Sequence, residues 1–466
     1  NFKLSSEDTL SIHPNSRDIL WNNIIFFKLF EFYKFDNLNI DFQNIELTDE
    51  NQNLEKEYKS KTFYKIRFLK RIIFKFFNFF NKVKKKNNAL IVSSGTPFIY
   101  EKLLELSFFQ LPKTYEVKKI KSNIYDKKIR SKIKSKLGYN HNSAGVENFI
   151  RLHLHEFLPM CFIENFKNFY EGCEKYYPEN PKFILTAIDH DYNEIFKFYT
   201  AKRVSKGTPY FTLQHGNTYF TQDYILSRCE YETSTKFLTF GHSKNSFFEP
   251  LGNIKTIGKK YKYNKKGKLN FIAPPMLGLF FPFDANHEFL KSFELIRDFE
   301  KKLPKYINEK ITLRLHPNFS TKRGNWFKET YLKNFSNHKV DIGSQSYNRF
   351  LSQGRFNLFF YDSSGMLENF HFNVPTLAIW TNKSELCYNH INNEFIEKYE
   401  LLKESGILFD NLDLLKNHIE KYWNDVDDWW FSKKTQNCIK EFNKDFNNKI
   451  NFNSLFKLRK IISKNI

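Results

Sequence analysis

Acidic residues are scarce in this sequence relative to basic ones. Aspartate and glutamate number 51 against 73 lysines and arginines, which leaves a formal net charge of +22. Such a balance attracts nucleic acid, an anionic membrane surface or an acidic substrate. The chain is also saturated with Lys, Asn, Ile and Phe, residues that have AT-rich codons. Genome composition is therefore an alternative explanation for much of the basic excess.

Cysteine and long apolar runs are also scarce. The five cysteines are widely scattered and form no CxxC pair, which argues against a disulfide framework or a zinc site and fits a reducing cytoplasm. No apolar run reaches the roughly 18 to 20 residues that span a bilayer, and no secretory signal is visible. His153 and His155 point to different sides of a helical stretch, so we expect no metal there or elsewhere, and no cofactor.

At 466 residues the chain exceeds what one hydrophobic core usually organises, so we expect two principal domains. Residues 1–87 are predicted to be a helical extension and residues 411–466 to be C-terminal helices. Between them we expect two Rossmann-like domains, over residues 88–262 and 263–410. The charged stretch from Lys260 to Lys268 is the predicted hinge.

Apolar runs alternate with helical patterns from residue 88 onwards, which predicts parallel sheets with right-handed crossovers. In the first half the predicted strands cover residues 89–92, 183–188, 208–213, 237–242 and 254–260. In the second half they cover residues 269–273, 311–315, 339–342, 356–361, 376–380 and 406–409, with helices over 287–303, 346–351 and 364–371. Residues 114–140 are expected to be a basic surface insertion. The C-terminal tryptophans are expected to fasten that segment across the domain junction, namely Trp423, Trp429 and Trp430.

Two polar motifs follow strands of the second half. His316 and Pro317 end one strand, and Ser363, Ser364 and Gly365 stand between a later strand and its helix. Two hydroxyls at the start of a helix can hold a phosphate, because the first turn has unbonded backbone N–H groups and the positive end of the helix dipole. The sequence therefore predicts an anion site.

A cluster of acidic residues follows a buried strand of the first half. Asp189, Asp191 and Glu194 come directly after residues 183–188. A carboxylate at a strand end suits a general base, which takes a proton from an acceptor hydroxyl. The alternative is that Asp189 or Asp191 caps the following helix.

The next strand ends in Gln214, His215, Gly216 and Asn217. A lone histidine is more often a packed or surface residue, but a strand end followed by glycine, which permits close backbone approach, favours a place in the site. Ser94 and Gly95 follow the first strand, and small residues after a strand's carboxyl end mark where open α/β sheets bind ligands.

Residues 62–86 alternate phenylalanine and isoleucine with lysine and arginine. A basic helix with aromatic side chains can lie in a lipid headgroup layer, which predicts peripheral membrane association. The alternative is a helix packed on the core with solvated lysines.

The His-Pro pair, the Ser-Ser turn, the glutamate Glu368 on the following helix and the upstream Gln-His-Gly together resemble the GT-B glycosyltransferases of bacterial surface polysaccharides. They are similar in particular to the sialyltransferases and Kdo transferases, which use CMP-activated ulosonic acids. The run from Ser94 to Tyr100 further resembles transferases of O-antigen clusters. The resemblance covers residues 88–410. It implies an α/β fold of the GT-B type, with two Rossmann-like domains facing across a cleft.

By that resemblance the chain is a metal-independent glycosyltransferase that moves Kdo, sialic acid or another nonulosonic acid from a CMP donor to a surface glycan or lipid-linked acceptor. The resemblance also implies that the protein works in lipopolysaccharide, O-antigen or capsule synthesis, at the inner face of the cytoplasmic membrane. His316, Ser363 and Ser364 would contact the donor phosphate, and Glu368 the ribose hydroxyls. Arg314 shares a strand face with His316 and would help to neutralise donor charge.

The acidic group from the opposite domain, Asp189 or Asp191, would then deprotonate the acceptor, although the sialyltransferases' acidic-acidic-Gly motif is absent. The same motifs are also similar to those of a second enzyme class. The CDP-glycerol glycerophosphotransferases, or teichoic acid polymerases, carry a His-Gly, a His-Pro and a Tyr-Ser-Ser-like turn, which Tyr361 to Ser364 resembles. In that case His215 is the base and His316 stabilises the phosphoryl group. A third alternative is a non-catalytic basic protein that binds a membrane or nucleic acid, but the sequence contains no nucleic-acid-binding motif.

Overall fold

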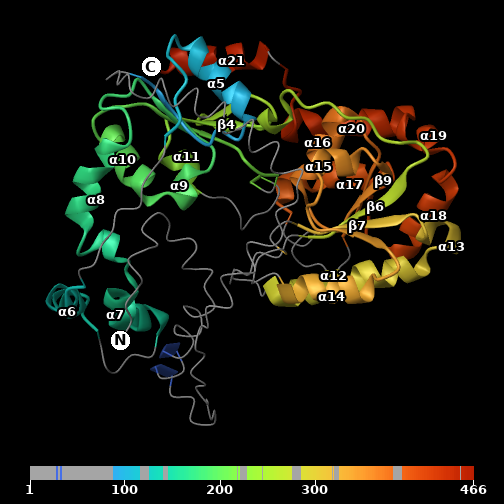
Figure 1. The fold of residues 1–466 in the computed structure, drawn as a ribbon, viewed down its shortest axis with the longest axis horizontal. Coiled ribbons are helices and arrows are strands. Elements are labelled where there is room, and N and C mark those ends of the chain that lie inside the picture. Colours follow the sequence, from blue (N-terminus) through green and yellow to red (C-terminus); the bar gives the residue numbers. More distant parts are fainter. Residues whose placement is uncertain are drawn as a thin grey trace. The chain divides into compact units, whose positions relative to one another are not determined.

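A computed structural model of the chain describes residues 28–29, 32–33, 88–115, 125–139, 145–217, 219–220, 228–243, 245–274, 285–316, 319, 325–380, 391–451 and 453–466. Its contacts divide the chain into two compact units (Figure 1). The first unit comprises Asn1–Thr48, Phe77–Ser94 and Gln110–Tyr210, and the second comprises Asp49–Phe76, Gly95–Phe109 and Phe211–Ile466. The predicted membrane segment, residues 62–86, and most of the first 87 residues lie outside the described residues.

The first sheet has the strand order β1-β2-β3-β4-β5, and its neighbours β1 and β2, β3 and β4, and β4 and β5 are parallel. The strands are β1 (Leu90–Ile91), β2 (Ile184–Thr186), β3 (Tyr210–Leu213), β4 (Lys236–Thr239) and β5 (Phe248–Pro250). Every residue of β1, β2 and β3 is buried, as expected for parallel strands covered on both faces. The first three strands lie within predicted runs, and β4 begins one residue before its predicted run.

One strand prediction in this half is wrong. Residues 254–260 contain the 3₁₀ turn η3 (Ile254–Thr256) instead of a strand. The side chain of Asn253 caps that turn by accepting the N–H of Lys255 at 3.3 Å. The local hydrogen bond of an asparagine thus competes with sheet pairing, and the preceding segment supplies β5.

The helices of the first unit are α6 (Lys127–Lys136), α7 (Val146–Phe157), α8 (Phe166–Gly172), α9 (Asp189–Tyr192) and α10 (Glu194–Val204), with short turns η1 (Met160–Phe162) and η2 (Cys173–Lys175). The predicted basic surface insertion, residues 114–140, contains α6. Arg130 of that helix is buried and pairs with Glu164 at 2.6 Å, so a single charge holds a helix whose other basic residues face solvent.

The second sheet has six parallel strands in the order β11-β10-β9-β6-β7-β8. They are β6 (Lys268–Ile272), β7 (Ile311–Arg314), β8 (Lys339–Asp341), β9 (Gly354–Phe359), β10 (Thr376–Ile379) and β11 (Leu408–Phe409). All six predicted strands are confirmed, because continuous apolar runs bounded by turn residues are typical of buried parallel strands. With two parallel sheets, the predicted α/β class is confirmed.

Helices cover both faces of this sheet. In Figure 1, α12 (Ala285–Lys302) and α14 (Asn325–Asn334) lie on one side of β6, β7 and β9, and α16 (Ser364–Phe372) and α20 (Lys433–Phe446) lie on the other. The remaining helices of the second unit are α5 (Phe98–Ser107), α11 (Arg228–Glu232), α13 (Lys305–Asn308), α15 (Tyr347–Leu351), α17 (Ile396–Glu404), α18 (Leu412–Tyr422), α19 (Val426–Trp430) and α21 (Asn453–Lys464). None of the helices among the described residues has the length and apolar character needed to cross a bilayer.

The C-terminal tryptophans pack on the second sheet's core. The indole N–H of Trp429 donates to the carbonyl of Ser405 at 2.8 Å, and that of Trp430 donates to Asn373 at 3.1 Å. The contact with the first sheet comes later, where Asn448 donates its N–H to the carbonyl of Phe240 at 2.8 Å. The segment after α20, rather than the tryptophans, therefore joins β4 to the second sheet's helices within the second unit.

The predicted hinge is fastened at several points. Lys259, just before it, pairs with Glu368 of α16 at 2.9 Å, and the Tyr261 hydroxyl donates to Asn369 at the same distance. Tyr263 bonds to Asp427 of α19. The predicted hinge is therefore bonded to α16 and α19. A division between acceptor and donor domains at residue 262 stays a prediction.

Candidate active site

The second sheet reverses its strand order at β6. From β6, the chain continues outwards through β7 and β8 on one side, and through β9, β10 and β11 on the other. Open α/β sheets of this order bind nucleotides beyond the carboxyl ends of the strands, at the point where the order reverses. Here that edge carries His316, which follows β7, and Asp362, Ser363 and Ser364, which follow β9.

The two serines have different partners. Ser363 is the N-cap of α16: its Oγ accepts the N–H of Gly365 at 3.1 Å and donates to the Tyr361 hydroxyl at 3.0 Å. Ser364 Oγ accepts the main-chain N–H of Asn217 at 3.1 Å. A hydroxyl has one proton to donate, so Ser363 has used its own, whereas Ser364 keeps a proton for a phosphate oxygen. The prediction that both serines bind phosphate is therefore sharpened towards Ser364.

Gly365 is required by packing. A Cβ built on it would lie 2.2 Å from the Tyr347 hydroxyl and 3.0 Å from a ring carbon of Phe359. The residue is buried under α15, which places its missing side chain against Tyr347 rather than towards a ligand. Burial raises the pKa of Tyr347 well above its usual range, and the nearby hydroxyl of Tyr361 and carboxylate of Glu368 act in the same direction.

His316 is half-buried at the end of β7, and its carbonyl accepts the N–H of Phe319 at 3.0 Å. Burial, and then the nearby Arg314 guanidinium, lower the pKa of His316 below its usual range. The imidazole is therefore neutral at neutral pH and offers one N–H donor. Its predicted neighbour Pro317 lies outside the described residues.

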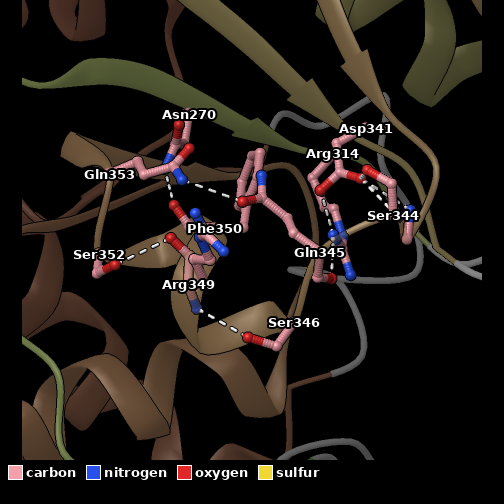
Figure 2. A network of polar contacts seen from close by, with 11 residues as sticks. Asn270, Arg314, Asp341, Ser344, Gln345, Ser346, Arg349, Phe350, Ser352 and Gln353 are labelled. Atoms are coloured by element: carbon pink, nitrogen blue, oxygen red, sulfur yellow. Dashed lines mark hydrogen bonds and ion pairs between the residues drawn. The ribbon is translucent and has the colours of Figure 1, made fainter. Parts of the chain in front are cut away.

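Arg314 has a buried partner. Its guanidinium contacts the carboxylate of Asp341 on the neighbouring strand β8 and donates to the carbonyl of Gln345 at 3.1 Å (Figure 2). The other oxygen of Asp341 accepts the N–H groups of Gly343 and Ser344 at 3.0 and 2.9 Å. Arg314 was predicted to neutralise the charge of the CMP-sugar donor. Its guanidinium instead bonds to Asp341 and Gln345 and fixes the loop after β8.

Glu368 is also paired. It is 7% exposed and forms the ion pair with Lys259 described above. The predicted ribose contact would therefore compete with a lysine. Sequence spacing correctly put Glu368 one turn beyond Ser364, but Lys259 is 109 positions away in the chain, so nothing local indicated the pair.

The turn after β3 meets the turn after β9. Besides the bond from its main chain to Ser364, Asn217 contacts the carboxylate of Asp362 through its side-chain amide. Gln214 holds the same turn from within: its side chain accepts the N–H of Phe240 at 2.7 Å and donates to the carbonyl of Gly216 at 2.8 Å. The predicted site residues Gln214 and Asn217 therefore have structural roles: they fix the turn that carries His215 against the turn that carries Ser364.

His215 has a partner that the sequence did not reveal. The hydroxyl of Tyr219 contacts its Nδ1 and donates to Glu230 at 2.8 Å. Five residues that bond to predicted site residues, directly or through Tyr219, were not identified from the sequence: Tyr219, Glu230, Asp362, Asp341 and Lys259. A tyrosine four residues after His215 and an aspartate before the serines were the available signals, whereas Glu230 had none.

The acidic cluster belongs to the first unit. The N–H of Asp189 donates to Thr186 Oγ1 at 3.0 Å, and Asn193, not an aspartate, caps α10 by accepting the N–H of Phe196. The alternative that Asp189 or Asp191 caps the following helix is therefore wrong for α10. Glu194 is fully buried and pairs with Lys197 at 2.7 Å, so it does not present a carboxylate to an acceptor.

The chain turns sharply directly after β1. Gly95 has a φ of 76° and Ser93 a φ of 45°, so the chain turns sharply there, and Ser94 between them is buried. Among the residues that the structure describes, no group of three or more His, Cys, Asp or Glu side chains could hold a metal ion.

Residues 1–460 match the model of the LIC12162 family, described as transferases. No curated protein sequence matches the chain. The fold is similar to the structure of TarM (9% identity, TM-score 0.33), with 60% of this chain and 54% of that chain covered, so the match spans about half of TarM.

Two further structures are similar over more of their length. The wall teichoic acid polymerase TagF shares 11% identity with a TM-score of 0.35, covering 64% of this chain and 84% of that one. A UDP-forming α,α-trehalose-phosphate synthase from Burkholderia xenovorans shares 8% identity with a TM-score of 0.39, covering 68% and 80%. TM-scores of this size establish neither a shared activity nor a shared donor.

Proposed function

The chain belongs to the LIC12162 family of transferases, and we propose that it is a GT-B glycosyltransferase that moves an ulosonic acid from a CMP-activated donor to a surface glycan or lipid-linked acceptor. One observation carries the proposal. His316 and Ser364 follow two strands of a sheet whose order reverses at β6, the place where sheets of this order hold nucleotides.

The donor phosphate lies against the N-terminus of α16. The Ser364 hydroxyl donates to a phosphate oxygen, and the dipole of α16 adds a favourable field. His316 donates its N–H to the same group from β7. These contacts strengthen as the bond between sugar and CMP breaks, because negative charge then collects on the departing phosphate. Neither Arg314 nor Glu368 is needed in this account, since each already has a charged partner.

The acceptor hydroxyl loses its proton to a base on the other side of the sugar. Asp189 or Asp191 is the base that the resemblance implies, with an acceptor domain over residues 88–262 and a donor domain over residues 263–410. His215 is the second candidate for this role, because the turn that carries it is bonded to the turn that carries Ser364. We expect the acceptor to lie against Ser94, Gly95 and Gly216, because these small residues leave room for it.

The direct test is to incubate the purified protein with CMP-Kdo, a CMP-nonulosonate and CDP-glycerol in turn, and to measure CMP release. We expect release from a CMP-sugar, and its loss in His316→Ala and in Ser364→Ala, with both variants still showing a cooperative thermal unfolding transition. Release from CDP-glycerol alone would overturn the choice of an ulosonic acid. Full activity in His316→Ala would exclude the proposed donor site.

CDP-glycerol phosphotransfer is the second candidate, and one observation favours it. His215, the base in that case, is anchored through Tyr219 to a buried glutamate, whereas Glu194 of the acidic cluster is buried with Lys197. The CDP-glycerol incubation separates the two candidates directly. Replacing Asp189 and Asp191 together by asparagine gives a second distinction: activity that survives this change assigns the base to His215.

Work at the inner face of the cytoplasmic membrane follows if the acceptor is lipid-linked. The basic aromatic segment at residues 62–86 is the proposed contact. Flotation with vesicles that contain anionic lipid tests it: exchanging the lysines of this segment for glutamine should abolish flotation, and unchanged flotation would contradict the proposal.

A further inference from the structure

Tyr219 connects His215 to a buried carboxylate. Its hydroxyl contacts Nδ1 of His215, lies 3.2 Å from Nε2 and donates to Oε1 of Glu230 at 2.8 Å. The two rings stand at 82° to one another, so the phenol approaches the edge of the imidazole. This chain of hydrogen bonds leads from the predicted base into the protein interior.

The direction of each bond follows from the available protons. Tyr219 has a single hydroxyl proton, and it donates that proton to Oε1 of Glu230. The phenol oxygen then accepts from the imidazole, and Nδ1 is the nearer of the two ring nitrogens, so Nδ1 carries the proton. A neutral His215 in this arrangement has its lone pair on Nε2.

Strand β3 holds both ends of this hydrogen-bond chain, His215 and Glu230. His215 follows the end of that strand directly after Gln214, whose side chain is bonded to Phe240. Thr212 within β3 donates its hydroxyl to the carbonyl of Glu230 at 2.9 Å, which fixes α11 on the same strand. The imidazole and the carboxylate therefore keep one relative position.

Burial makes the arrangement costly unless it is complete. Glu230 is 3% exposed and Tyr219 is 7% exposed. A buried carboxylate requires hydrogen-bond donors, and the tyrosine hydroxyl is one. The rest of the Tyr219 ring packs among apolar side chains, with the ring centre of Phe237 5.8 Å away.

We propose that Tyr219 and Glu230 are positioning residues for His215: they hold the imidazole in the tautomer with Nδ1 protonated and Nε2 as the proton acceptor for the transferred group's acceptor hydroxyl. The use of that tautomer in transfer rests on the proposed function. The tautomer itself does not, because it is a property of the protein without any substrate.

The first experiment is ¹⁵N NMR of the full chain labelled at its 13 histidines, with the His215 signals identified by their loss in His215→Gln. We expect wild-type His215 above its titration range to show a protonated Nδ1 and an unprotonated Nε2. Tyr219→Phe should convert this to a mixture of tautomers or to the opposite one. Tyr231→Phe is the matched control, because that residue sits beside Glu230 in α11 and contacts Phe248 rather than His215. A wild-type signal of the opposite tautomer, or one that Tyr219→Phe leaves unchanged, would overturn the proposal.

The second experiment measures transfer. Tyr219→Phe should lower kcat on the order of tenfold to hundredfold, the usual cost of removing the partner that orients a functional histidine, with KM for the donor unchanged. Glu230→Gln should act in the same direction, and Tyr231→Phe should not. Should Glu230→Gln fail to fold, Tyr219→Phe keeps the test intact because it retains the buried ring.

The two experiments fail separately. A tautomer that depends on Tyr219 in a protein that releases CMP from none of the donors supports the positioning residues and contradicts the proposed function. Donor turnover that is unaffected by Tyr219→Phe supports the proposed function and contradicts the positioning residues.

Discussion

The main-chain N–H of Asn217 donates to Oγ of Ser364 at 3.1 Å, joining residues 147 positions apart in the chain. The same asparagine contacts Asp362 through its side chain. The turn after β3 and the turn after β9 are therefore bonded directly, and His215 and the start of α16 keep a constant separation. Transfer between a base on one turn and a donor on the other requires such a fixed separation.

The adjacent serines should give different phenotypes. Ser363→Ala removes the N-cap of α16 and should lower the free energy of unfolding by about 0.5 to 2 kcal/mol, with modest effect on CMP binding. Ser364→Ala removes the proposed phosphate donor and the acceptor of Asn217, and should weaken CMP binding by about tenfold or more, equivalent to about 1.4 kcal/mol. Calorimetric titration with CMP and urea unfolding measure the two quantities.

An exposed serine with a similar local bond, Ser205, provides the matched control. Ser205→Ala should change neither quantity. The reverse pattern, with CMP binding lost in Ser363→Ala and intact in Ser364→Ala, would show that the cap is the phosphate ligand.

Gly365→Ala should destabilise the protein, because the new Cβ would lie 2.2 Å from the Tyr347 hydroxyl. Overpacking of this kind costs about 1 to 3 kcal/mol, read as a lower midpoint in urea unfolding. Tyr347→Phe removes the clashing oxygen, so the double variant should recover part of the loss. Gly216→Ala is the control for stability, since its new Cβ would meet Tyr219 at 3.5 Å, an ordinary contact. Equal losses in Gly365→Ala with and without Tyr347→Phe would show that the clash lies elsewhere.

Arg314→Met should lower the free energy of unfolding by about 3 to 5 kcal/mol, because it leaves the carboxylate of Asp341 buried without its cation. Although burial alone would raise the pKa of Asp341, the Arg314 guanidinium and the groups of Ser344 hold that pKa below its usual range. The wild type should therefore lose this stabilisation in acid, as the pH falls through the lowered pKa.

The exposed Arg349 of α15 is the matched control for Arg314 (Figure 2). Arg349→Met should change the free energy of unfolding by no more than about 0.5 kcal/mol. Similar losses in the two variants would contradict the buried pair as the source of stability.

Acidification should destabilise the second unit through two half-buried histidines, His371 and His418. Burial, assisted by Lys449 for His371 and by Lys421 for His418, lowers the pKa of each to about 4. The unfolded chain takes up protons on these residues near pH 6.5, whereas the folded chain does not until about pH 4. Stability is therefore fully present above pH 6.5 and falls as the pH drops towards 4, by up to about 1.4 kcal/mol per pH unit for each histidine.

Urea unfolding at several pH values between 7 and 4 measures this slope, and His418→Gln should reduce it. A slope that is unchanged in His418→Gln would show that this histidine titrates alike in the folded and unfolded chain.

Local patterns predicted most of the elements and some of the site. The six strands of the second sheet were predicted from apolar runs, and Ser363 and His316 were predicted as site residues from their places at strand ends. Where a short-range polar bond competes, the pattern was misleading: the side chain of Asn253 caps a 3₁₀ turn where a strand was expected.

The sequence by itself determined the α/β class, most strand positions and the residues at the carboxyl edge of the second sheet, because burial and helical or strand periodicity are properties of neighbouring residues. The tertiary structure alone decided what those residues do. Ser363 caps while Ser364 receives Asn217, Glu368 pairs with Lys259, and His215 leads through Tyr219 to Glu230. Each of these choices depends on which distant group arrives to satisfy a buried donor or acceptor, and no local pattern records that.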